Sequence, residues 1–526
     1  MPKPVFKPCM QHQPMLLPPD LSDLIDTNHL VRVVDSVIDA IDTQELYALY
    51  PGGGTSSYDP KMMLKVIVYA YTVDIYSSRK IEKATKENIH FMWLSGMTPL
   101  DHMTINRFRS ERIRPVFESI FTQVVGLLAD KGLITLETYF LDGTKIEANA
   151  NKYTFVWKKS VEGYQAKLRA KVREHLEEID RINEEEDRLA EALPEPEEVS
   201  AEDIAEAARR INEKLKARPK DKELKRAKKA FEQDYLVRAR RYEEQLDVFQ
   251  ERRSFSKTDN DATFMRMKED HMGNGQLKAA YNVQIGTENQ FIVASTLHRR
   301  AGDTACMIPH VEHAKNLYGM PPYTLTTDAG YGSEENHAYL ESLDVRAFVK
   351  YNMFHKEQKR FFKKDPTQPK NWGFNKNADE WMCLQGRTLS FLHEKKERSD
   401  LGYESTVRLY RCCDCSGCPH QKKCTKSDDE SRNRTIYVNP LRDAYRRRAE
   451  RRLTSAEGVV LRRRRATDVE TVFGNIKQNH GFKRFTLRGL DKVTHEWHLV
   501  AFAHNMRKLF EAMSGKNAVK GQGCFA

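Results

Sequence analysis

The chain has 526 residues, 40% of them hydrophobic, so it is long enough to bury several cores and to form two to four domains. Lys and Arg outnumber Asp and Glu by 86 to 75, which gives a net charge of +11 and favours a polyanionic partner such as nucleic acid. The sequence has neither an apolar signal segment nor eighteen consecutive apolar residues, so we expect no membrane span and a cytoplasmic location.

The first part of the sequence predicts short helices joined by turns. Residues 21–49 have helical periodicity, which the glycine run at residues 51–54 ends. Pro60, Ser77 and Asp101 are each suited to begin one of three further helices. Together these patterns predict a compact N-terminal helical domain.

Three arginines, Arg107, Arg109 and Arg112, lie on the last of these helices. Short helices with a basic final helix are typical of DNA-binding domains of the helix-turn-helix type. A plain helical bundle with a solvated basic face has the same pattern. The sequence alone favours neither interpretation.

Residues 161–250 are rich in charges of both signs, with Leu, Ala and Ile at helical spacing. We expect two or three long helices there that form an antiparallel hairpin inserted into another domain. The flanking residues are rich in β-formers. A strand over residues 137–141 ends at Asp142, residues 144–148 supply a partner, and two strands after the insertion are joined by Glu288 and Asn289.

A helix over residues 304–317 then leads to a second apolar strand that ends in a carboxylate, Asp328, before a glycine. A helix over residues 334–343 and a strand over residues 345–351 follow. The sequence from residue 354 to residue 437 looks irregular, aromatic and basic. Beyond an arginine-rich segment, helical patterns cover residues 467–479 and 496–513.

A strand-terminal aspartate is more often a turn former than a ligand, but two such residues on successive strands suggest a site. Neighbouring carboxylates repel each other unless a cation holds them, and Mg²⁺ or Mn²⁺ prefers such oxygen ligands. The best third acid is Glu470, whose helix has apolar companions and places Lys477 on the same face. The alternatives are Asp468 and Glu457.

Five cysteines lie between residues 412 and 424, and four of them have metal-ligand spacing: Cys412, Cys415, Cys418 and Cys424. Paired Cys-x2-Cys spacing favours a structural zinc ion, and the triple repeat also fits an iron–sulfur cluster less strongly. Cys413 and His420 are alternate ligands, and reduced free thiols are the other interpretation.

Five sequence blocks resemble the insertion-sequence DDE transposases that have an RNase H-like catalytic domain. They begin with YDPKMMLKVIVYAY, FLDGTKIEANANKYTF, KAAYNVQIGTENQFIVAS, TTDAGYGSEEN and VETVFGNIKQNHGFKRF. The resemblance is greatest to the branch named insertion sequence eleven-eighty-two, within the four-type superfamily. It implies that Asp142, Asp328 and Glu470 are a catalytic triad that binds two Mg²⁺ or Mn²⁺ ions.

The superfamily also has a Tyr-x2-Arg-x3-Glu-x6-Lys signature around the third acid. Here Arg463 and Ala466 occupy the first two places, so the resemblance leaves Arg464 or Arg465 to supply the arginine contact. It implies that Lys477 contacts a phosphate near the scissile bond. Tyr331 either stacks a displaced DNA base or is a packed turn residue, and the second interpretation is preferred.

The predicted fold is α/β, with an RNase H-like mixed sheet flanked by helices. The predicted organisation is an N-terminal helical DNA-binding domain (1–130), the catalytic core in two parts (131–158 and 256–352), a charged helical insertion (159–255), a Cys-containing insertion (353–440) and a basic C-terminal segment (441–526).

The predicted function is that of a bacterial, nucleoid-associated transposase that binds double-stranded transposon ends and target DNA as a homodimer. It would cleave DNA with metal-activated water and transfer the strand without a covalent protein intermediate. Two alternatives stay open: a non-catalytic DNA-binding protein derived from a transposase, and an RNase H-fold nuclease without strand transfer.

Overall fold

The structure, a computed structural model, describes residues 20–50, 57–183, 198–267, 275–399, 401–429 and 431–515. The glycine run at residues 51–54 lies outside these ranges. The chain divides into two compact units. One comprises residues 1–135, 289–292 and 495–526, and the other comprises residues 136–288 and 293–494. Among the described residues, no helix combines the length and the apolar character needed to cross a membrane.

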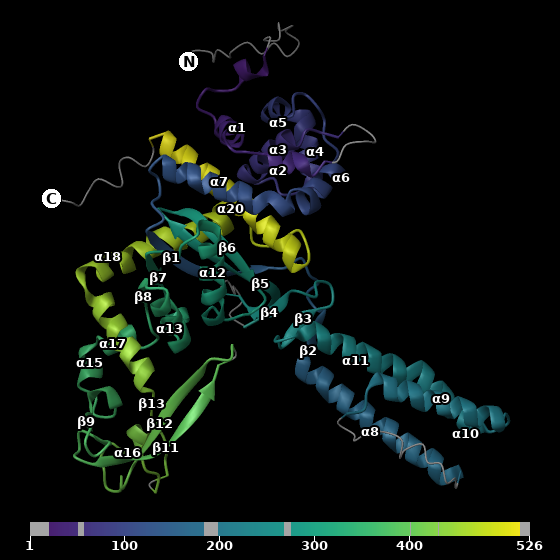
Figure 1. Cartoon of the computed structure of the whole chain (residues 1–526), viewed down its shortest axis with the longest axis vertical. Coiled ribbons are helices and arrows are strands. Elements are labelled where there is room, and N and C mark those ends of the chain that lie inside the picture. Colours follow the sequence, from purple (N-terminus) through teal and green to yellow (C-terminus); the bar gives the residue numbers. More distant parts are fainter. Residues whose placement is uncertain are drawn as a thin grey trace, which may run out of the picture. The chain divides into compact units, whose positions relative to one another are not determined.

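The first unit is helical (Figure 1). Local capping explains where several of its helices begin, because the side chains of Asp59 and Asp101 accept hydrogen bonds from backbone N–H groups in the first turn of their helices. The three helices predicted after the glycine run are confirmed. The helices of this unit are α1 (Leu30–Ala40), α2 (Gln44–Ala48), α3 (Pro60–Thr72), α4 (Ser78–Glu87), α5 (Ile89–Leu94), α6 (His102–Arg107), α7 (Phe117–Asp130) and most of α20 (Leu490–Met513).

The second unit contains a mixed six-stranded sheet with the order β4-β5-β1-β7-β8, in which β6 also pairs with β5. The antiparallel part is β1 with β5 and β5 with β4, and the parallel part is β1 with β7 and β7 with β8. This mixed α/β arrangement is consistent with the RNase H-like fold. The strands are β1 (Thr138–Glu147), β4 (Thr263–Arg266), β5 (Leu277–Glu288), β6 (Phe291–His298), β7 (Thr324–Thr327) and β8 (Arg346–Val349).

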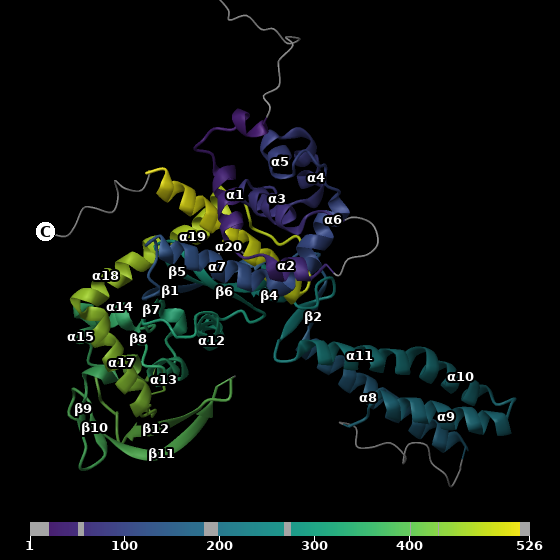
Figure 2. The same cartoon turned by 45° about the horizontal axis from the view of Figure 1, so that its top comes forward.

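Helices flank this sheet, with α12 (Met307–Tyr318) between β6 and β7 and α13 (Glu334–Ser342) between β7 and β8. The helices α17 (Pro440–Thr454) and α18 (Ala456–Arg465) pack on the parallel strands. Both lie near β7 and β8 in Figures 1 and 2. The residues that follow α18, up to Asn479, alternate between π-helical turns and the short helix α19 (Thr471–Gly474).

The charged insertion is helical and has its own core. It joins β2 (Phe155–Trp157) to β3 (Ser254–Ser256), which pair with each other at its base. Its helices bury Val, Leu, Ile and Ala side chains together with Phe231 and Phe249. They lie side by side in Figures 1 and 2 and are α8 (Lys158–Asn183), α9 (Ala201–Ala217), α10 (Lys222–Ala230) and α11 (Leu236–Phe249).

The segment predicted to be irregular, residues 354–437, contains a five-stranded antiparallel sheet with the order β13-β12-β11-β10-β9. The prediction was wrong because β11 is almost entirely exposed and therefore lacks alternating apolar residues. A small core around Trp372, Leu389 and Tyr410 holds the sheet together. The strands are β9 (Gly373–Asn375), β10 (Glu380–Met382), β11 (Thr388–Arg398), β12 (Glu404–Cys412) and β13 (Thr435–Val438).

Candidate active site

The sheet register brings Asp142 and Asp328 to the same level of two neighbouring strands. Phe140 on β1 is paired in parallel with Thr326 on β7, and each aspartate lies two residues further along its chain. Strand β7 ends at Thr327, so Asp328 follows the strand end as predicted. The two carboxylates therefore belong to adjacent positions at one edge of the parallel part of the sheet.

The prediction that a strand ends at Asp142 was wrong, because β1 continues through this residue to Glu147. The antiparallel partner β5 extends beyond the end of β7 and pairs Ile285 with Asp142 and Gln284 with Gly143. The sequence reads as a strand end because the run after Asp142 is polar. Its residues are nevertheless buried at alternate positions against β5.

Gly143 is small because of its neighbours within the protein. A Cβ atom at this position would lie 2.2 Å from Nε2 of Gln284 and 2.7 Å from Oδ1 of Asp303. Both distances are shorter than any real contact, so an added methyl group would displace these side chains. The residue beside Asp142 is therefore fixed by a polar cluster that includes a further carboxylate, Asp303.

Arg465 connects Glu470 to Asp142 by hydrogen bonds to both carboxylates. Arg465 donates from Nη1 to Oδ2 of Asp142 at 3.0 Å and from Nη2 to Oε1 of Glu470 at 2.8 Å. Arg465 is only 8% exposed, and Asp142 only 6%, whereas the Glu470 side chain is 56% exposed. A buried guanidinium thus lies between two carboxylates that would otherwise repel each other.

A π-helical turn over Ala466–Glu470 explains why this arginine is five residues before the glutamate. The i to i+5 repeat of a π-helix inserts one residue into the turn, so Arg465 and Glu470 lie beside each other. Arg464 points elsewhere: its guanidinium lies 5.4 Å from the Phe140 ring centre and 3.8 Å from Oδ2 of Asp468. Of the two arginines that the resemblance left open, Arg465 is the one that contacts the third acid.

The two alternative third acids are engaged elsewhere. Asp468 is buried and accepts a hydrogen bond from Oγ1 of Thr287 at 2.9 Å. Glu457 forms an ion pair with Arg346 at 2.6 Å. A pocket of about 190 Å³ is lined by Asp142, Glu470 and Lys477, together with Gly143, Thr144, Phe473, Gly474 and Gln478.

Asp328 shares surroundings with both other acids. Burial raises the pKa of Tyr331 well above its ordinary value, and the charges of Asp303, Asp142 and Asp328 raise it further. Burial and two arginines lower the pKa of Lys350, whereas Asp328 and Glu470 raise it. Each pair of acids therefore lies within electrostatic reach of a common side chain.

The three acids do not converge on one point. Among the described residues, Glu82, Asp101 and His102 form the one group of three ligand atoms that lie within 4.8 Å of one another. That group is already held by Lys86, which contacts Glu82 at 2.7 Å. Because Asp142, Asp328 and Glu470 do not share one point, they would suit two ions better than one. The three carboxylates, two of which contact a guanidinium, offer the oxygen ligands that hard divalent ions prefer.

Four residues expected to bind DNA are buried: Arg465 and Lys477 beside the acids, and Tyr331 and Arg109, which are packed within the protein. Tyr331 is 0% exposed and its hydroxyl donates to Oε1 of Gln284, so the packed-turn interpretation holds. Arg109 is 3% exposed and donates to the Tyr71 hydroxyl at 3.1 Å and to the Tyr76 carbonyl at 2.7 Å. The expectation that Arg109 contacts DNA is therefore corrected: its helix turns this guanidinium into the core of the first unit.

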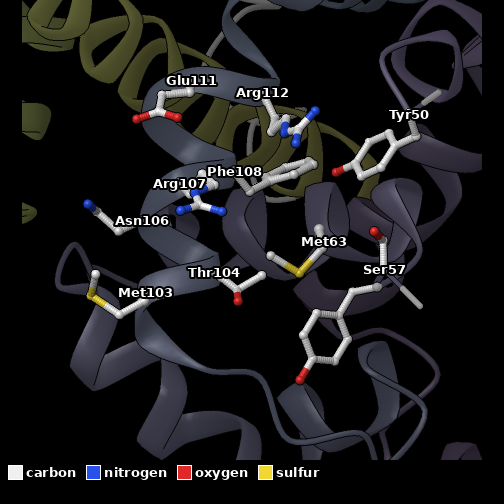
Figure 3. A pocket seen from close by; sticks show the side chains of 11 residues that line it. Tyr50, Ser57, Met63, Met103, Thr104, Asn106, Arg107, Phe108, Glu111 and Arg112 are labelled. Atoms are coloured by element: carbon white, nitrogen blue, oxygen red, sulfur yellow. The ribbon is translucent and has the colours of Figure 1, made fainter. Parts of the chain in front are cut away.

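The other two arginines of this region border an open pocket. Arg107 and Arg112 are exposed and line a pocket of about 530 Å³ in the first unit. Figure 3 shows the Arg112 guanidinium beside the Tyr50 ring, and the two groups are 5.3 Å apart. Both arginines leave N–H groups for a phosphate, and the neighbouring ring could stack with a base.

Cysteines gather around the small core of the five-stranded sheet, and Cys383, which lies outside the segment from residue 412 to residue 424, joins them. Cys383 packs there with Cys412, Cys415 and Cys424. The pKa of the Cys424 thiol is raised by burial and then by the charges of Cys415, Cys418 and Cys383. None of these thiols forms a disulfide. Sequence spacing missed Cys383 because it lies 29 residues before Cys412 and is brought close by pairing of β10 with β11 and β11 with β12.

Comparisons with known proteins agree on one class. A model described as "Transposase domain (DUF772)" matches residues 19–111, and one described as "Transposase DDE domain" matches residues 382–510. No curated protein and no solved structure matches the chain. The second match includes Glu470 and Lys477, whereas Asp142 and Asp328 lie between the two matches.

The two matches, together with the mixed α/β fold, support an assignment of the chain to the DDE transposases of insertion sequences. Both matches are compatible with the branch that the sequence blocks resemble, and neither match distinguishes that branch from its relatives.

Proposed function

We propose that this transposase binds transposon ends and target DNA and catalyses DNA cleavage and strand transfer with Asp142, Asp328 and Glu470. The observation that supports the proposal most strongly is the bridge from Asp142 through Arg465 to Glu470, next to Lys477. It joins residues more than 300 positions apart in the chain at the edge of the sheet where Asp328 also lies.

The three acids would hold two Mg²⁺ or Mn²⁺ ions, and bound ions would supply Lewis-acid activation of the attacking oxygen and stabilise the leaving one. Arg465 neutralises Asp142 and Glu470 in the free protein and would be released when cations take its place. Lys477 lines the same pocket and would contact a phosphate of the DNA backbone. Buried Asp142 would keep its orientation, because β5 and Gly143 fix it on both sides.

An assay on transposon-end DNA tests this proposal. The protein is incubated with Mg²⁺ or Mn²⁺ and labelled DNA that carries the terminal repeats flanking its gene. We expect wild type to cleave and join this DNA, and Asp142→Asn, Asp328→Asn and Glu470→Gln each to lose at least about 100-fold in rate, as expected for loss of a metal ligand. Glu457→Gln is the matched control, because that acid pairs with Arg346 outside the pocket.

Each alternative function gives a different result in this assay. Binding by wild type without cleavage would favour a non-catalytic DNA-binding protein. Cleavage without joining would favour a nuclease. Full activity of Glu470→Gln together with loss in Asp468→Asn would assign the third position to Asp468.

End binding is assigned to the first unit, where Arg107 and Arg112 are exposed beside a pocket. On the same DNA, the double variant Arg107→Ala and Arg112→Ala should bind more weakly and with a smaller dependence on salt, because two phosphate contacts are lost. Arg114→Ala, another exposed arginine close by in the chain, is the control. Equal affinity and salt dependence in all three proteins would place DNA elsewhere. We also propose that the protein acts as a homodimer that brings two transposon ends together.

We further propose a structural zinc site at Cys383, Cys415, Cys418 and Cys424. Cys412 is left out because its thiol donates to the Asp414 carbonyl at 3.3 Å. The backbone N–H of Arg434 donates to Sγ of Cys415 at 3.4 Å, a contact of the kind that supports a metal-bound sulfur. No three of the described sulfur atoms lie within 4.8 Å of one another, so metal binding would draw the thiols together.

Metal analysis of the purified protein tests this site. We expect about one zinc ion per chain, lost in Cys383→Ser and retained in Cys413→Ser, whose thiol is exposed. Loss in Cys412→Ser with retention in Cys383→Ser would restore the ligand set expected from spacing. Iron and sulfide in place of zinc would indicate a cluster.

A further inference from the structure

The loop after β6 places a fourth carboxylate, Asp303, beside the proposed triad. Asp303 precedes a short 3-10 turn, Thr304–Cys306, where an aspartate commonly caps the turn, but its side chain makes no such hydrogen bond. Its Oδ1 atom instead accepts from Nδ2 of Asn282 at 2.8 Å and from Nε2 of Gln284 at 3.0 Å. Both donors are 0% exposed, so they fix the direction of this carboxylate.

This carboxylate lies close to a glycine near each of the first two acids. Oδ1 of Asp303 is 2.7 Å from the position of a Cβ atom on Gly143, the neighbour of Asp142. Oδ2 is 3.7 Å from the position of a Cβ atom on Gly330, and Oδ1 of Asp328 is 3.0 Å from that same position. One oxygen of Asp303 therefore lies beside Gly143, and the other lies on the same side of Gly330 as the Asp328 carboxylate.

The second oxygen is available to a ligand. Oδ2 of Asp303 has no hydrogen-bond donor among the described residues, and Asp303 is half-buried. The two loops are tied together, because Thr304 donates to the Gly330 carbonyl at 2.6 Å and Asn336 donates to the carbonyls of Thr304 and Tyr331, both at 2.9 Å. The position of Oδ2 relative to Asp328 is thus set by the fold.

We propose that Asp303 is a positioning residue of the metal site, and that its Oδ2 accepts a hydrogen bond from water in the hydration shell of the ion that Asp328 holds. This inference rests on the proposed function of the triad. Mg²⁺ keeps several of its waters when it binds to proteins, and residues that orient such waters affect affinity about 10- to 100-fold. The buried amides of Asn282 and Gln284 leave Oδ2 as the oxygen that can serve this role.

The substitution Asp303→Asn separates this role from a structural one. Asparagine keeps an Oδ1 acceptor for Asn282 and Gln284, but it removes the charge and the acceptor at Oδ2. The readout is Mn²⁺ binding to the full chain without DNA, followed by electron paramagnetic resonance. The control is Asp344→Asn, an exposed aspartate in a left-handed turn that asparagine also adopts.

We expect Asp303→Asn to bind Mn²⁺ about tenfold more weakly than wild type, with unchanged melting temperature and with no further loss when it is added to Asp328→Asn. If Asp303→Asn binds Mn²⁺ like wild type while Asp142→Asn does not, the inference about Asp303 is overturned and the triad stands. If Asp142→Asn also binds Mn²⁺ like wild type, the proposed metal site itself is overturned.

Discussion

Arg465 is the residue that most clearly distinguishes this site from a bare group of acids. Its guanidinium is nearly buried and contacts Asp142 and Glu470, which are the first and third acids of the proposed triad. This cation, fixed on the protein, holds the two carboxylates close to each other. The same contact means that metal ions must compete with the arginine for both oxygens.

The substitution Arg465→Met tests this competition. Without metal, we expect the variant to be about 1 to 3 kcal/mol less stable, because buried Asp142 loses its contact with the guanidinium, while Glu470 is half exposed and loses less. Added Mg²⁺ should then raise the melting temperature of the variant more than that of wild type. Arg463→Met, at an exposed neighbouring position, is the control. Equal stabilisation of wild type and Arg465→Met by Mg²⁺ would contradict the idea.

At the level of single residues, the sequence was informative where chemistry is encoded locally. The patterns around Asp328, which precedes a glycine, and around Glu470, which precedes Lys477, can be recognised from the sequence alone. The fold then places Asp328 next to Asp142 in register. The packed interpretation preferred for Tyr331 was confirmed, whereas the burial of Arg109 could not be predicted, because nothing in its sequence neighbours reveals its contact with the Tyr71 hydroxyl. Asp303 was missed because its partners lie on a strand about 20 residues earlier.

At the level of elements, helix starts were predictable and sheet edges were not. Asp59 and Asp101 cap helices within a few residues, so the signal is local. Strand β1 was cut short at Asp142 because its burial depends on β5, more than 100 residues later. Strand β11 was missed because its exposed residues have the composition of a loop.

The contact between α13 and α17 predicts a dependence of stability on pH. The ring of His337 on α13 stacks on Tyr445 of α17 with centres 5.7 Å apart. Burial and then the charges of Arg446, Arg452 and Arg448 lower the pKa of His337 to about 4. A neutral folded histidine with an unfolded pKa near 6.5 stabilises the fold fully above pH 6.5, and this stability is lost as the pH falls towards 4.

The substitution His337→Phe keeps an aromatic ring on Tyr445 and removes the titration. Between pH 7 and pH 5, wild type should lose about 2 kcal/mol more unfolding free energy than the variant, as measured by urea denaturation at each pH. Within the part of the chain that the structure describes, Nε2 of His337 has no hydrogen-bond partner, so the replacement removes no hydrogen bond at this atom. Parallel losses in the two proteins would show that other groups dominate acid destabilisation.

At the level of the whole molecule, the site depends on chain segments that long insertions separate. A helical insertion lies between β2 and β3, and the five-stranded sheet with its cysteines lies between β8 and α17. Composition predicted both as separate from the core, because one is dense in charge and the other in cysteine. The strand pairing at the base of the helical insertion could not be predicted, since β2 pairs with β3 across almost 100 residues.

The central claim is that Asp142, Asp328 and Glu470 meet around divalent ions only when the whole second unit is folded. Anomalous diffraction from Mn²⁺-soaked crystals tests it most directly. We predict Mn²⁺ peaks contacted by Asp142 and Asp328, one of them also by Glu470, with the Arg465 guanidinium displaced from its bridge between Asp142 and Glu470. Peaks away from these carboxylates, with Arg465 still between Asp142 and Glu470, would contradict the account.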